Sequence, residues 1–325
     1  MNAATAGTGF DGLIIAAIVP CYNEEVAVPQ VVTDLLAAVD DITVYVYDNN
    51  SNDRTAEVAA AAGAIVRTET RKGKGNVVRR AFADIDADIY LLIDGDDTYD
   101  ASAAPLMIET LLSGPYDHVL GVRTEESDES AYRPGHEAGN RMFNRLISHL
   151  FGEDVTDMLS GYRVFSRRFV KSFPALSREF EIETELTVHA VNLRLPQVEV
   201  PVGFKDRPEG SESKLRTYHD GFRILRLIGS LLQHERPLAL FSTIGAFFMV
   251  VAVILGIPLF FTYAETHAVP RLPTAVLATG VMLAGIMSFV VGLVLNGIQR
   301  QRRESARLSY LRLPSVARPD RPTNS

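Results

Sequence analysis

The sequence predicts an α/β domain built on a mostly parallel sheet, followed by interfacial helices and two transmembrane helices. The first observation behind this prediction is an alternation of strand-like and helix-like segments from Leu13 onward, which favours parallel strands joined by right-handed crossovers. The second is that three of these strands run directly into polar residues. The third is a pair of long apolar runs in the last quarter of the chain.

The alternation follows the apolar pattern of the chain. Short apolar runs rich in β-branched and aromatic residues predict strands, here over Leu13–Val19, Thr43–Tyr47, Ala64–Arg67, Ile89–Ile93 and His118–Val122. The longer segments between them predict helices over Glu24–Val39, Thr55–Ala62 and Asn76–Ala83.

Composition limits the functions that the chain can serve. Its 325 residues leave room for one large domain and an appendage. A net charge of −8 argues against nucleic acid as a partner. Cys21 is the only cysteine, which excludes an intrachain disulfide and fits a cytoplasmic setting. The N-terminal residues lack the basic and apolar segments of a signal peptide, so we expect none.

An acidic turn, Asp94-Gly95-Asp96-Asp97, follows the fourth predicted strand. Open α/β sheets bind ligands at the carboxyl ends of their parallel strands. Carboxylates crowded there repel one another unless a cation joins them, and oxygen ligands suit Mg²⁺ or Mn²⁺. We therefore predict that Asp94 and Asp96 hold a metal that binds a diphosphate, with a solvated loop as the alternative. Asp97 is either a further ligand or the cap of the next helix.

Two other strands also end in polar residues. The first predicted strand runs into Pro20–Glu25, and the second runs into Asp48–Asp53. Adjacent parallel strands bring such ends together along one edge, where they form a crevice the size of a nucleotide. The Asp48 carboxylate there can accept hydrogen bonds from a base or ribose, and Tyr22 offers an aromatic face.

The two apolar runs, Leu238–Phe261 and Leu272–Ile298, contain no charged residue, and each is long enough to span a bilayer. Because basic residues flank the pair on its outer sides, the positive-inside rule places both chain ends and the N-terminal domain in the cytoplasm. Ala284, Ser288 and Gly292 recur every four residues on the second run and predict close helix packing, either within the hairpin or between subunits.

The motifs resemble a known family. IVPCYNEE, VYDNNSNDRT and LLIDGDDTYD resemble the nucleotide-binding half of family-two glycosyltransferases. DMLSGYRVFSR, FEIETEL and FKDRPEGSESKL resemble dolichol-phosphate mannose synthases and bacterial polyprenyl-phosphate glucosyltransferases. The resemblance spans Leu13 to Ile298 and implies a Rossmann-like nucleotide-sugar-binding domain of the GT-A type. Asn49 departs from it, because the family often has a second Asp there.

The resemblance implies an inverting transfer of a hexose from UDP-glucose or GDP-mannose to a polyprenyl phosphate. A metal on Asp94 and Asp96 would neutralise the leaving diphosphate. A lipid phosphate is already an anion at neutral pH, so the reaction needs no general base. Nucleotide-sugar contacts are expected from Pro20, Tyr22, Asn23, Glu24, Asp48, Asn50, Lys74, Asp94 and Gly95.

Binding of an anionic acceptor next to an anionic donor requires cations. The expected catalytic residues are Asp96, Arg123, Arg163, Arg207 and Lys214, and the expected contacts to the lipid phosphate are Arg123, Arg133, His136 and Arg163. A surface ion pair is the alternative for each cation taken alone. For Lys74, in the basic entry to a predicted helix, a solvated turn is the alternative to a phosphate contact. Glu183 is a candidate for orienting a cationic or sugar-binding neighbour.

The lipid requires a route to the site. Asn140–Phe151 and Tyr218–Leu232 are amphipathic and basic, as expected of helices at a membrane surface. An ordinary core helix is the alternative for the first. The expected organisation is a transferase domain at 1–215, an interface helix at 216–236, a transmembrane hairpin at 237–299 and a basic cytoplasmic tail at 300–325.

Other functions remain open at this point. Within the same family, the acceptor could be a glycolipid or a growing polysaccharide. A processive synthase usually carries a Q-x-x-R-W motif, and this chain has no tryptophan. A catalytically silent scaffold that binds nucleotide sugars has no evident need for Asp94, Asp96, Arg207 and Lys214 together. The sequence leaves open both the oligomeric state and which sugar is transferred.

Overall fold

The computed structural model describes residues 12–125, 156–175, 182–205 and 236–316, together with Phe10, Arg207 and Gln233. The chain divides into two compact units, which are treated separately below. The first unit is Met1–Ser213 with Ala306–Ser325, and the second is Lys214–Ser305.

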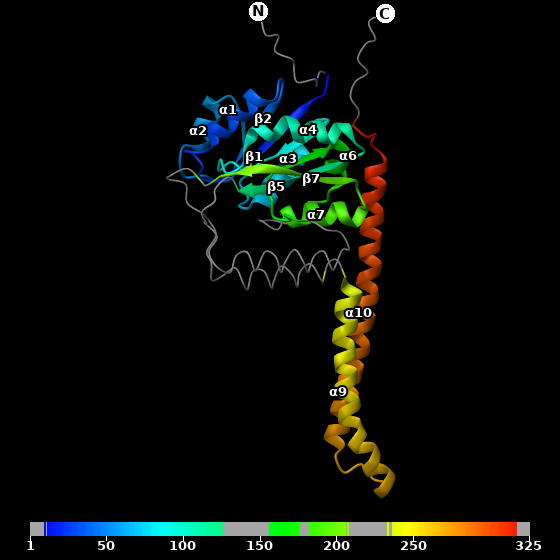
Figure 1. The fold of residues 1–325 in the computed structure, drawn as a ribbon. Helices are drawn as coiled ribbons and strands as arrows, with labels where there is room; N and C mark the ends of the chain where they lie inside the picture. The colour runs from blue at the N-terminus through cyan, green and yellow to red at the C-terminus, as the bar shows by residue number, and fades with distance from the viewer. Residues whose placement is uncertain are drawn as a thin grey trace, which may run out of the picture. The chain divides into compact units, whose positions relative to one another are not determined.

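The first unit is built on a seven-stranded sheet with the order β3-β2-β1-β4-β6-β5-β7. Figure 1 shows β1, β2, β5 and β7 of this sheet with helices around them. The strands are β1 (Ile15–Cys21), β2 (Thr43–Asp48), β3 (Ile65–Thr68), β4 (Ile89–Leu92), β5 (His118–Glu125), β6 (Arg163–Ser166) and β7 (Gln197–Phe204). β1 pairs in parallel with β2 and with β4, and β2 pairs in parallel with β3. β5 and β7 also pair in parallel. Only β6 runs antiparallel to its neighbours, β4 and β5. The predicted mostly parallel α/β sheet is therefore confirmed.

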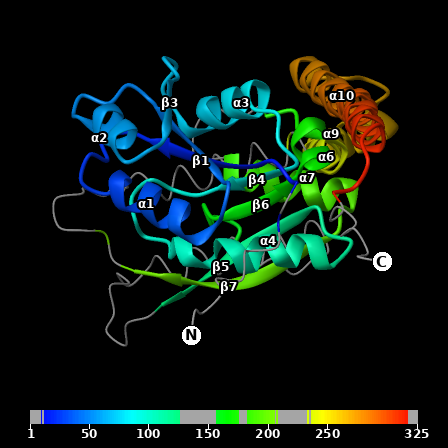
Figure 2. The ribbon, with the colours of Figure 1, turned by 90° about the horizontal axis from the view of Figure 1, so that it is seen from above.

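Helices cover both faces of this sheet. They are α1 (Val28–Ala38), α2 (Thr55–Ala61), α3 (Lys74–Asp84), the short 3₁₀ helix η1 (Ala101–Ala103), α4 (Ala104–Ser113), α6 (Arg167–Ser172) and α7 (Ile182–Leu193). Figure 2 shows α1 and α3 on opposite sides of β1. The first unit is thus a three-layer α/β/α arrangement.

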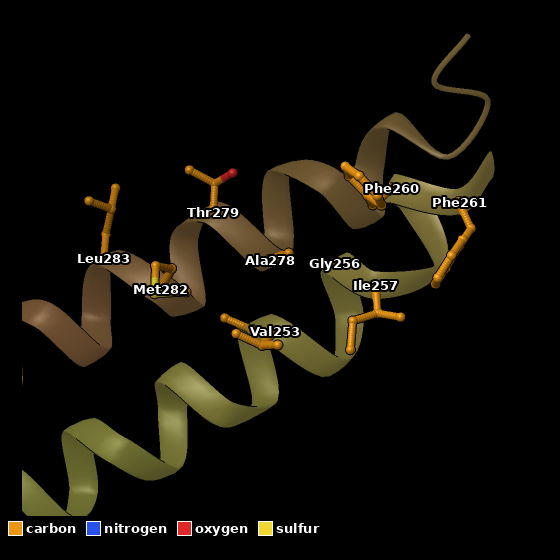
Figure 3. Close-up of a pocket in the computed structure, with 10 residues that line it drawn as sticks. Val253, Gly256, Ile257, Phe260, Phe261, Ala278, Thr279, Met282 and Leu283 are labelled. Carbon is orange, nitrogen blue, oxygen red and sulfur yellow. The ribbon is translucent and has the colours of Figure 1, made fainter. Parts of the chain in front are cut away.

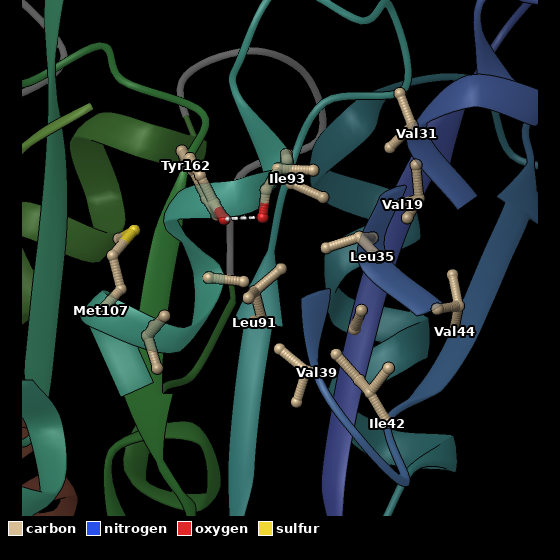
Figure 4. Close-up of a cluster of buried hydrophobic side chains, with 14 of the residues drawn as sticks. Val19, Val31, Leu35, Val39, Ile42, Val44, Leu91, Ile93, Met107 and Tyr162 are labelled. Atoms are coloured by element: carbon tan, nitrogen blue, oxygen red, sulfur yellow. Dashed lines mark hydrogen bonds between the residues drawn. The ribbon is translucent and has the colours of Figure 1, made fainter. Parts of the chain in front are cut away.

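Each strand of the sheet centre is buried on both faces. In β1, Ala17 and Val19 contact the core under α1 and α4, while Ala16 and Ile18 contact the core under α3, α6 and α7. Figure 4 shows Val31 and Leu35 of α1 packed near Val19 and Leu91. Burial on both faces explains why these strands read as continuous apolar runs.

Two details of the chain differ from the expected elements. The helix expected from Glu24 begins at Val28, because Glu24–Ala27 form a turn and Pro29 lies in the first helical turn. Arg163, expected in a turn, is the first residue of β6. Pairing with β4 and β5 makes this short segment a strand.

The second unit contains α9 (Pro237–Thr266) and most of α10 (Leu272–Leu311), both long and apolar enough to cross a membrane. Within this unit, a Cβ on Gly285 would lie 2.9 Å from the Gly245 carbonyl oxygen, and the Ser288 hydroxyl donates to the Phe241 carbonyl at 3.0 Å. Of the three small residues expected to allow close packing, Ser288 and Gly292 lie against α9 in the hairpin, whereas Ala284 is exposed. Further along the same helices lies an apolar pocket lined by Val253, Ile257 and Met282, among others (Figure 3).

Candidate active site

The three polar strand ends predicted from the sequence lie side by side. Cys21 at the end of β1 pairs with Asp48 at the end of β2, and Asp48 pairs with Thr68 of β3. β4 stops at Leu92, which is level with Ile18, and the acidic turn follows it. One edge of the sheet thus gathers these three endings into a single polar region.

Two glycines allow the acidic turn to lie close to its neighbours. A Cβ on Gly95 would collide with the Cys21 thiol and lie 3.3 Å from the Pro20 carbonyl oxygen. A Cβ on Gly161 would collide with the carboxylate of Asp94. Both positions therefore require glycine for the turn to pack between the end of β1 and the Ser160–Arg163 segment.

Asp94 belongs to a buried group of charges. The ammonium of Lys74, the first residue of α3, contacts the Asp94 carboxylate and lies 2.5 Å from Glu183 Oε1. The side chains of Lys74 and Glu183 are only 8% and 5% exposed. Burial opposes the charge on Lys74, but the two carboxylates outweigh it and raise the pKa of the ammonium. Lys74 therefore stays charged and pairs with both acids.

Asp96 and Asp97 also pair with cations. Arg207 Nη2 lies 2.5 Å from Asp96 Oδ2, and Lys205 Nζ lies 2.9 Å from Asp97 Oδ1. Burial and the charge of Asp94 raise the pKa of the Asp96 carboxyl. Asp97 does not cap the next helix, since Asp100 accepts the hydrogen bond from Ser102 N at the start of η1.

Arg123 lies at the end of β5, where Asp157 holds it. Its Nε and Nη2 donate to the two carboxylate oxygens of Asp157, each at 2.7 Å. Its guanidinium also lies 5.4 Å from the centre of the Phe204 ring. Since the Arg123 side chain remains 26% exposed, this bidentate pair presents an oriented cation at the surface of the domain.

Arg163 lies elsewhere, and this corrects its expected placement at a phosphate. Its side chain is fully buried and donates to the carbonyls of Met158 and Ser160 and to the hydroxyl of Thr187, at 2.8–2.9 Å. Burial lowers the pKa of the guanidinium to about 10. The group satisfies backbone carbonyls inside the fold and has no solvent-exposed surface for a lipid phosphate.

The loop after β1 and the loop after β2 are joined by hydrogen bonds. Asn23 N donates to the Ser51 hydroxyl at 2.9 Å, and Asn52 N donates to Asn23 Oδ1 at 2.8 Å. Glu24 N donates to the Thr55 hydroxyl at 2.8 Å. Asn23 and Glu24, which are expected to contact the nucleotide, therefore help to join the two loops.

The expected base-binding residues lie in the same loops. Asp48 Oδ1 accepts from Ser51 N at 3.3 Å and is 8% exposed. The ring of Tyr22 faces the ammonium of Lys72, 5.3 Å from the ring centre. Asn50 has a positive φ of 64° and donates through its side chain to the carbonyl of Thr70 at 2.9 Å.

Asn49, Tyr99 and Lys205 were not among the site residues predicted from the sequence, although Asn49 was noted as a departure from the family pattern. The amide of Asn49 ties the β2 loop to the segment before α3. Tyr99 Oη accepts from Gly161 N at 2.8 Å and so fixes the backbone beside Asp94. Lys205 pairs with Asp97. The only sequence feature that could have indicated Lys205 is its place in the motif Phe204–Arg207. No sequence feature indicated Tyr99. Arg133, His136, Lys214 and both predicted interface helices lie outside the described residues.

The donor set of the acidic turn fits a divalent metal bound together with a diphosphate. Among the described residues no group of three or more His, Cys, Asp or Glu is arranged to hold a metal by itself. Mg²⁺ is usually held by one or two carboxylates and completes its shell with waters and substrate phosphates. Asp94 and Asp96 supply two carboxylates, and both already attract cations of the chain.

Comparison with known proteins decides the family. The model of the family described as "Glycosyl transferase family 2" matches residues 16–173. The glycosyltransferase AglJ of Haloferax volcanii is 33% identical over 294 residues, which cover 89% of this chain and 95% of AglJ. The chain belongs to glycosyl transferase family 2. It is therefore a glycosyltransferase, as the motifs predicted.

Other relatives of this family 2 transferase carry more specific names. A dolichyl-phosphate hexose transferase of Haloferax volcanii is 30% identical over 227 residues, covering 70% of this chain and 96% of the relative. Glucosyl-3-phosphoglycerate synthase from Mycobacterium tuberculosis, solved with Mn²⁺, UDP-glucose and phosphoglyceric acid, superposes with a TM-score of 0.57. This synthase is 24% identical to the chain, and the match covers 68% of this chain and 79% of the synthase. The structural similarity confirms the GT-A type of fold.

Proposed function

We propose that this transferase moves a hexose from a nucleoside-diphosphate sugar to the phosphate of a polyprenyl lipid. The observation that carries the proposal is the acidic turn surrounded by basic side chains, in a chain with two membrane-length helices. The name of the dolichyl-phosphate hexose transferase relative supports the same acceptor chemistry.

The donor would bind along the strand ends. Asp48 and Tyr22 lie where a base and ribose would be held, and Asp94 and Asp96 would hold Mg²⁺ or Mn²⁺. When bound, the metal would neutralise charge that develops on the leaving diphosphate. Lys74 and Arg207 would contribute fixed positive charge beside the same group.

The acceptor brings its own nucleophile. A phosphate monoester oxygen is anionic at neutral pH, so attack on the sugar carbon with inversion needs no protein base. The protein must instead reduce the repulsion between two anions. Arg123 and Arg207 are exposed enough to do this, and Lys214, Arg133 and His136 are further candidates from the sequence.

The membrane supplies the acceptor lipid. Only 11% of the most apolar part of α9 and of α10 is buried within the protein, unlike the core helix of a water-soluble domain. Side chains such as Phe247 and Phe260 are 65% and 70% exposed, which favours apolar surroundings. We place the hairpin in the bilayer and the sheet domain and both termini in the cytoplasm, following the basic flanks of the two helices.

A transfer assay tests the proposal. Purified full-length protein in detergent is given labelled UDP-glucose, GDP-mannose or UDP-N-acetylglucosamine together with polyprenyl phosphate. Label should move onto the lipid phosphate with one of these donors and remain in the water phase with EDTA. Transfer to the dephosphorylated polyprenol, or to a glycolipid, but not to polyprenyl phosphate would reject the proposed acceptor.

The metal assignment has its own test. Asp96→Ala should abolish transfer while the protein stays folded, because the mutation removes a carboxylate that is repelled by Asp94 and belongs to neither hydrophobic core. Asp100→Ala is the matched control, since this carboxylate caps η1 and belongs to no ion pair of the site. Full activity in EDTA would show that Asp94 and Asp96 hold no essential metal.

A further inference from the structure

Glu183, near the start of α7, is a buried acid with a side chain that is 5% exposed. Its Oε1 lies 2.5 Å from the ammonium of Lys74. Among the residues that the structure describes, no group donates a hydrogen bond to its Oε2. Burial raises the pKa of the Glu183 carboxyl, and Lys74 opposes this rise. A carboxylate held inside the fold with one oxygen unbonded is costly, so its charge calls for an explanation.

Lys74 shares its ammonium between this acid and the acidic turn. Within the described part of the chain, its ion-pair partners are Asp94 and Glu183. Three segments meet here, since Lys74 begins α3, Asp94 follows β4 and Glu183 lies in α7. An ammonium has three N–H donors and can serve both carboxylates at once. Glu183 therefore holds Lys74 independently of Asp94.

We propose that Glu183 is a positioning residue of the donor site, which keeps the Lys74 ammonium in place when a divalent metal takes the oxygens of Asp94. This inference rests on the metal-dependent donor site proposed above. A metal and an ammonium compete for the same carboxylate oxygens, because their charges repel each other at such distances. With Glu183 present, Lys74 keeps a carboxylate partner after the metal has bound.

Loss of the Glu183 charge would make the same exchange costly. The Lys74 side chain is 8% exposed, so an ammonium that lost Asp94 as well would have little water and no acid to compensate its charge. Lys74 would therefore hold Asp94 more firmly and compete with the metal. If the ammonium were removed together with the Glu183 charge, this competition for Asp94 would disappear.

Mn²⁺ binding without any turnover tests this inference. Electron paramagnetic resonance of free Mn²⁺, with the full-length protein in detergent, measures the affinity for Mn²⁺ alone and with UDP or GDP. Glu183→Gln keeps the size of the side chain and removes its charge. This variant should bind Mn²⁺ about tenfold more weakly than the parent, which corresponds to one hydrogen bond to a charged group.

A double variant separates positioning from a structural role. In Lys74→Met combined with Glu183→Gln, no ammonium competes for Asp94, so the affinity for Mn²⁺ should return to within about threefold of the parent or exceed it. Defects of packing would instead add up in the double variant. Since Lys74 is also an expected contact of the nucleotide sugar, this comparison uses Mn²⁺ alone.

Asp117→Asn is the matched control, because it also removes the charge of a buried carboxylate that pairs with a cation, here Arg168. Asp117 bonds to Ser166, which pairs with Ile89 at the start of β4, whereas the acidic turn follows the end of β4. The control should lower the unfolding temperature and change the Mn²⁺ affinity less than about threefold.

The outcomes separate the inference from the proposed function. An unchanged Mn²⁺ affinity in Glu183→Gln, or an equal loss in Asp117→Asn, overturns the positioning role. A double variant that binds Mn²⁺ more than about tenfold more weakly than the parent also overturns it, even if Glu183→Gln alone does not fold. Failure of the parent to bind Mn²⁺ even with UDP or GDP rejects instead the metal-dependent donor site itself.

Discussion

At the residue scale, Asn49 departs from the family pattern, and its hydrogen bonds show what its side chain does. Its Nδ2 donates to the carbonyls of Glu69 and Arg71, both at 2.8 Å, and its Oδ1 accepts from Gly73 N at 2.7 Å. An aspartate has no side-chain donor for the two carbonyls. Asn49 therefore fastens the β2 loop to the segment that leads into Lys74.

Asn49→Asp should raise the KM for the nucleotide sugar about tenfold and leave kcat within about twofold. The expected size follows from the hydrogen bonds that the carbonyls of Glu69 and Arg71 lose, which shifts the loop after β2 rather than the reacting groups. Steady-state kinetics at saturating lipid measure both constants. Gln30→Ala, an exposed position on α1, serves as the control, and an unchanged KM in Asn49→Asp would contradict the role.

Arg163→Met should lower the free energy of unfolding by about 3 kcal/mol or more, because carbonyls buried around the guanidinium lose their donors. Thermal unfolding followed by circular dichroism measures the loss. The folded fraction should keep the parent KM for the lipid phosphate. If Arg163→Met raised the KM for the lipid and left the stability unchanged, Arg163 would instead act at the acceptor site.

His189 makes stability depend on pH. Burial lowers its pKa to about 4, from 6.5, so the unfolded chain binds a proton between these values and the folded protein does not. Stability contributed by the neutral ring is therefore present above pH 6.5 and is lost as pH falls, by about 1.4 kcal/mol per pH unit. His189→Gln keeps a partner for the Ser172 hydroxyl and should flatten this dependence in unfolding experiments between pH 5 and 7. If the free energy of unfolding of His189→Gln fell as steeply with decreasing pH as that of the parent, this role of His189 would be contradicted.

At the scale of elements, the end of α10 is part of the sheet unit. Asp117 is fully buried and accepts from Tyr310 Oη at 2.7 Å, from the Ser166 hydroxyl at 2.6 Å and from both Nε and Nη2 of Arg168. Arg307 also donates to the Leu193 carbonyl at 2.8 Å. The expected tail from residue 300 is thus helical up to Leu311, and its residues from Ala306 belong to the first unit.

Tyr310→Phe should destabilise the sheet unit by about 1–2 kcal/mol, because buried Asp117 loses one donor. The unfolding temperature of the full-length protein measures this effect. Tyr263→Phe provides the control, as Tyr263 is exposed at the far end of α9. Equal unfolding temperatures for Tyr310→Phe and the parent would show that the bond contributes nothing.

At the scale of the whole molecule, the two long helices predict the topology. Cys21 is buried, so single cysteines introduced elsewhere can be labelled selectively. In vesicles of known orientation, Ala268→Cys should react with an impermeant maleimide from the non-cytoplasmic side, and Ser315→Cys only from the cytoplasmic side. Both positions are exposed. Labelling of both from one side would contradict a spanning hairpin.

Much of the structure can be predicted from the local pattern of apolar and polar residues. Strand and helix alternation, the position of the acidic turn and the two membrane-length helices depend on residues close together in sequence, and the structure contains all of them. The antiparallel strand β6 could not be foreseen, because it forms only where β4 and β5 accept it. Local sequence cannot indicate which distant strand supplies the pairing.

The sequence by itself determined the fold class, the family and the edge of the sheet where the ligand residues gather. Only the tertiary structure decided which cations serve which acids. It turned Arg163 inward, set Lys74 between Asp94 and Glu183, and brought Tyr310 to Asp117 across 193 positions of the chain. The reason is physical, since the energy of a charged side chain depends on burial and on partners that are distant in sequence.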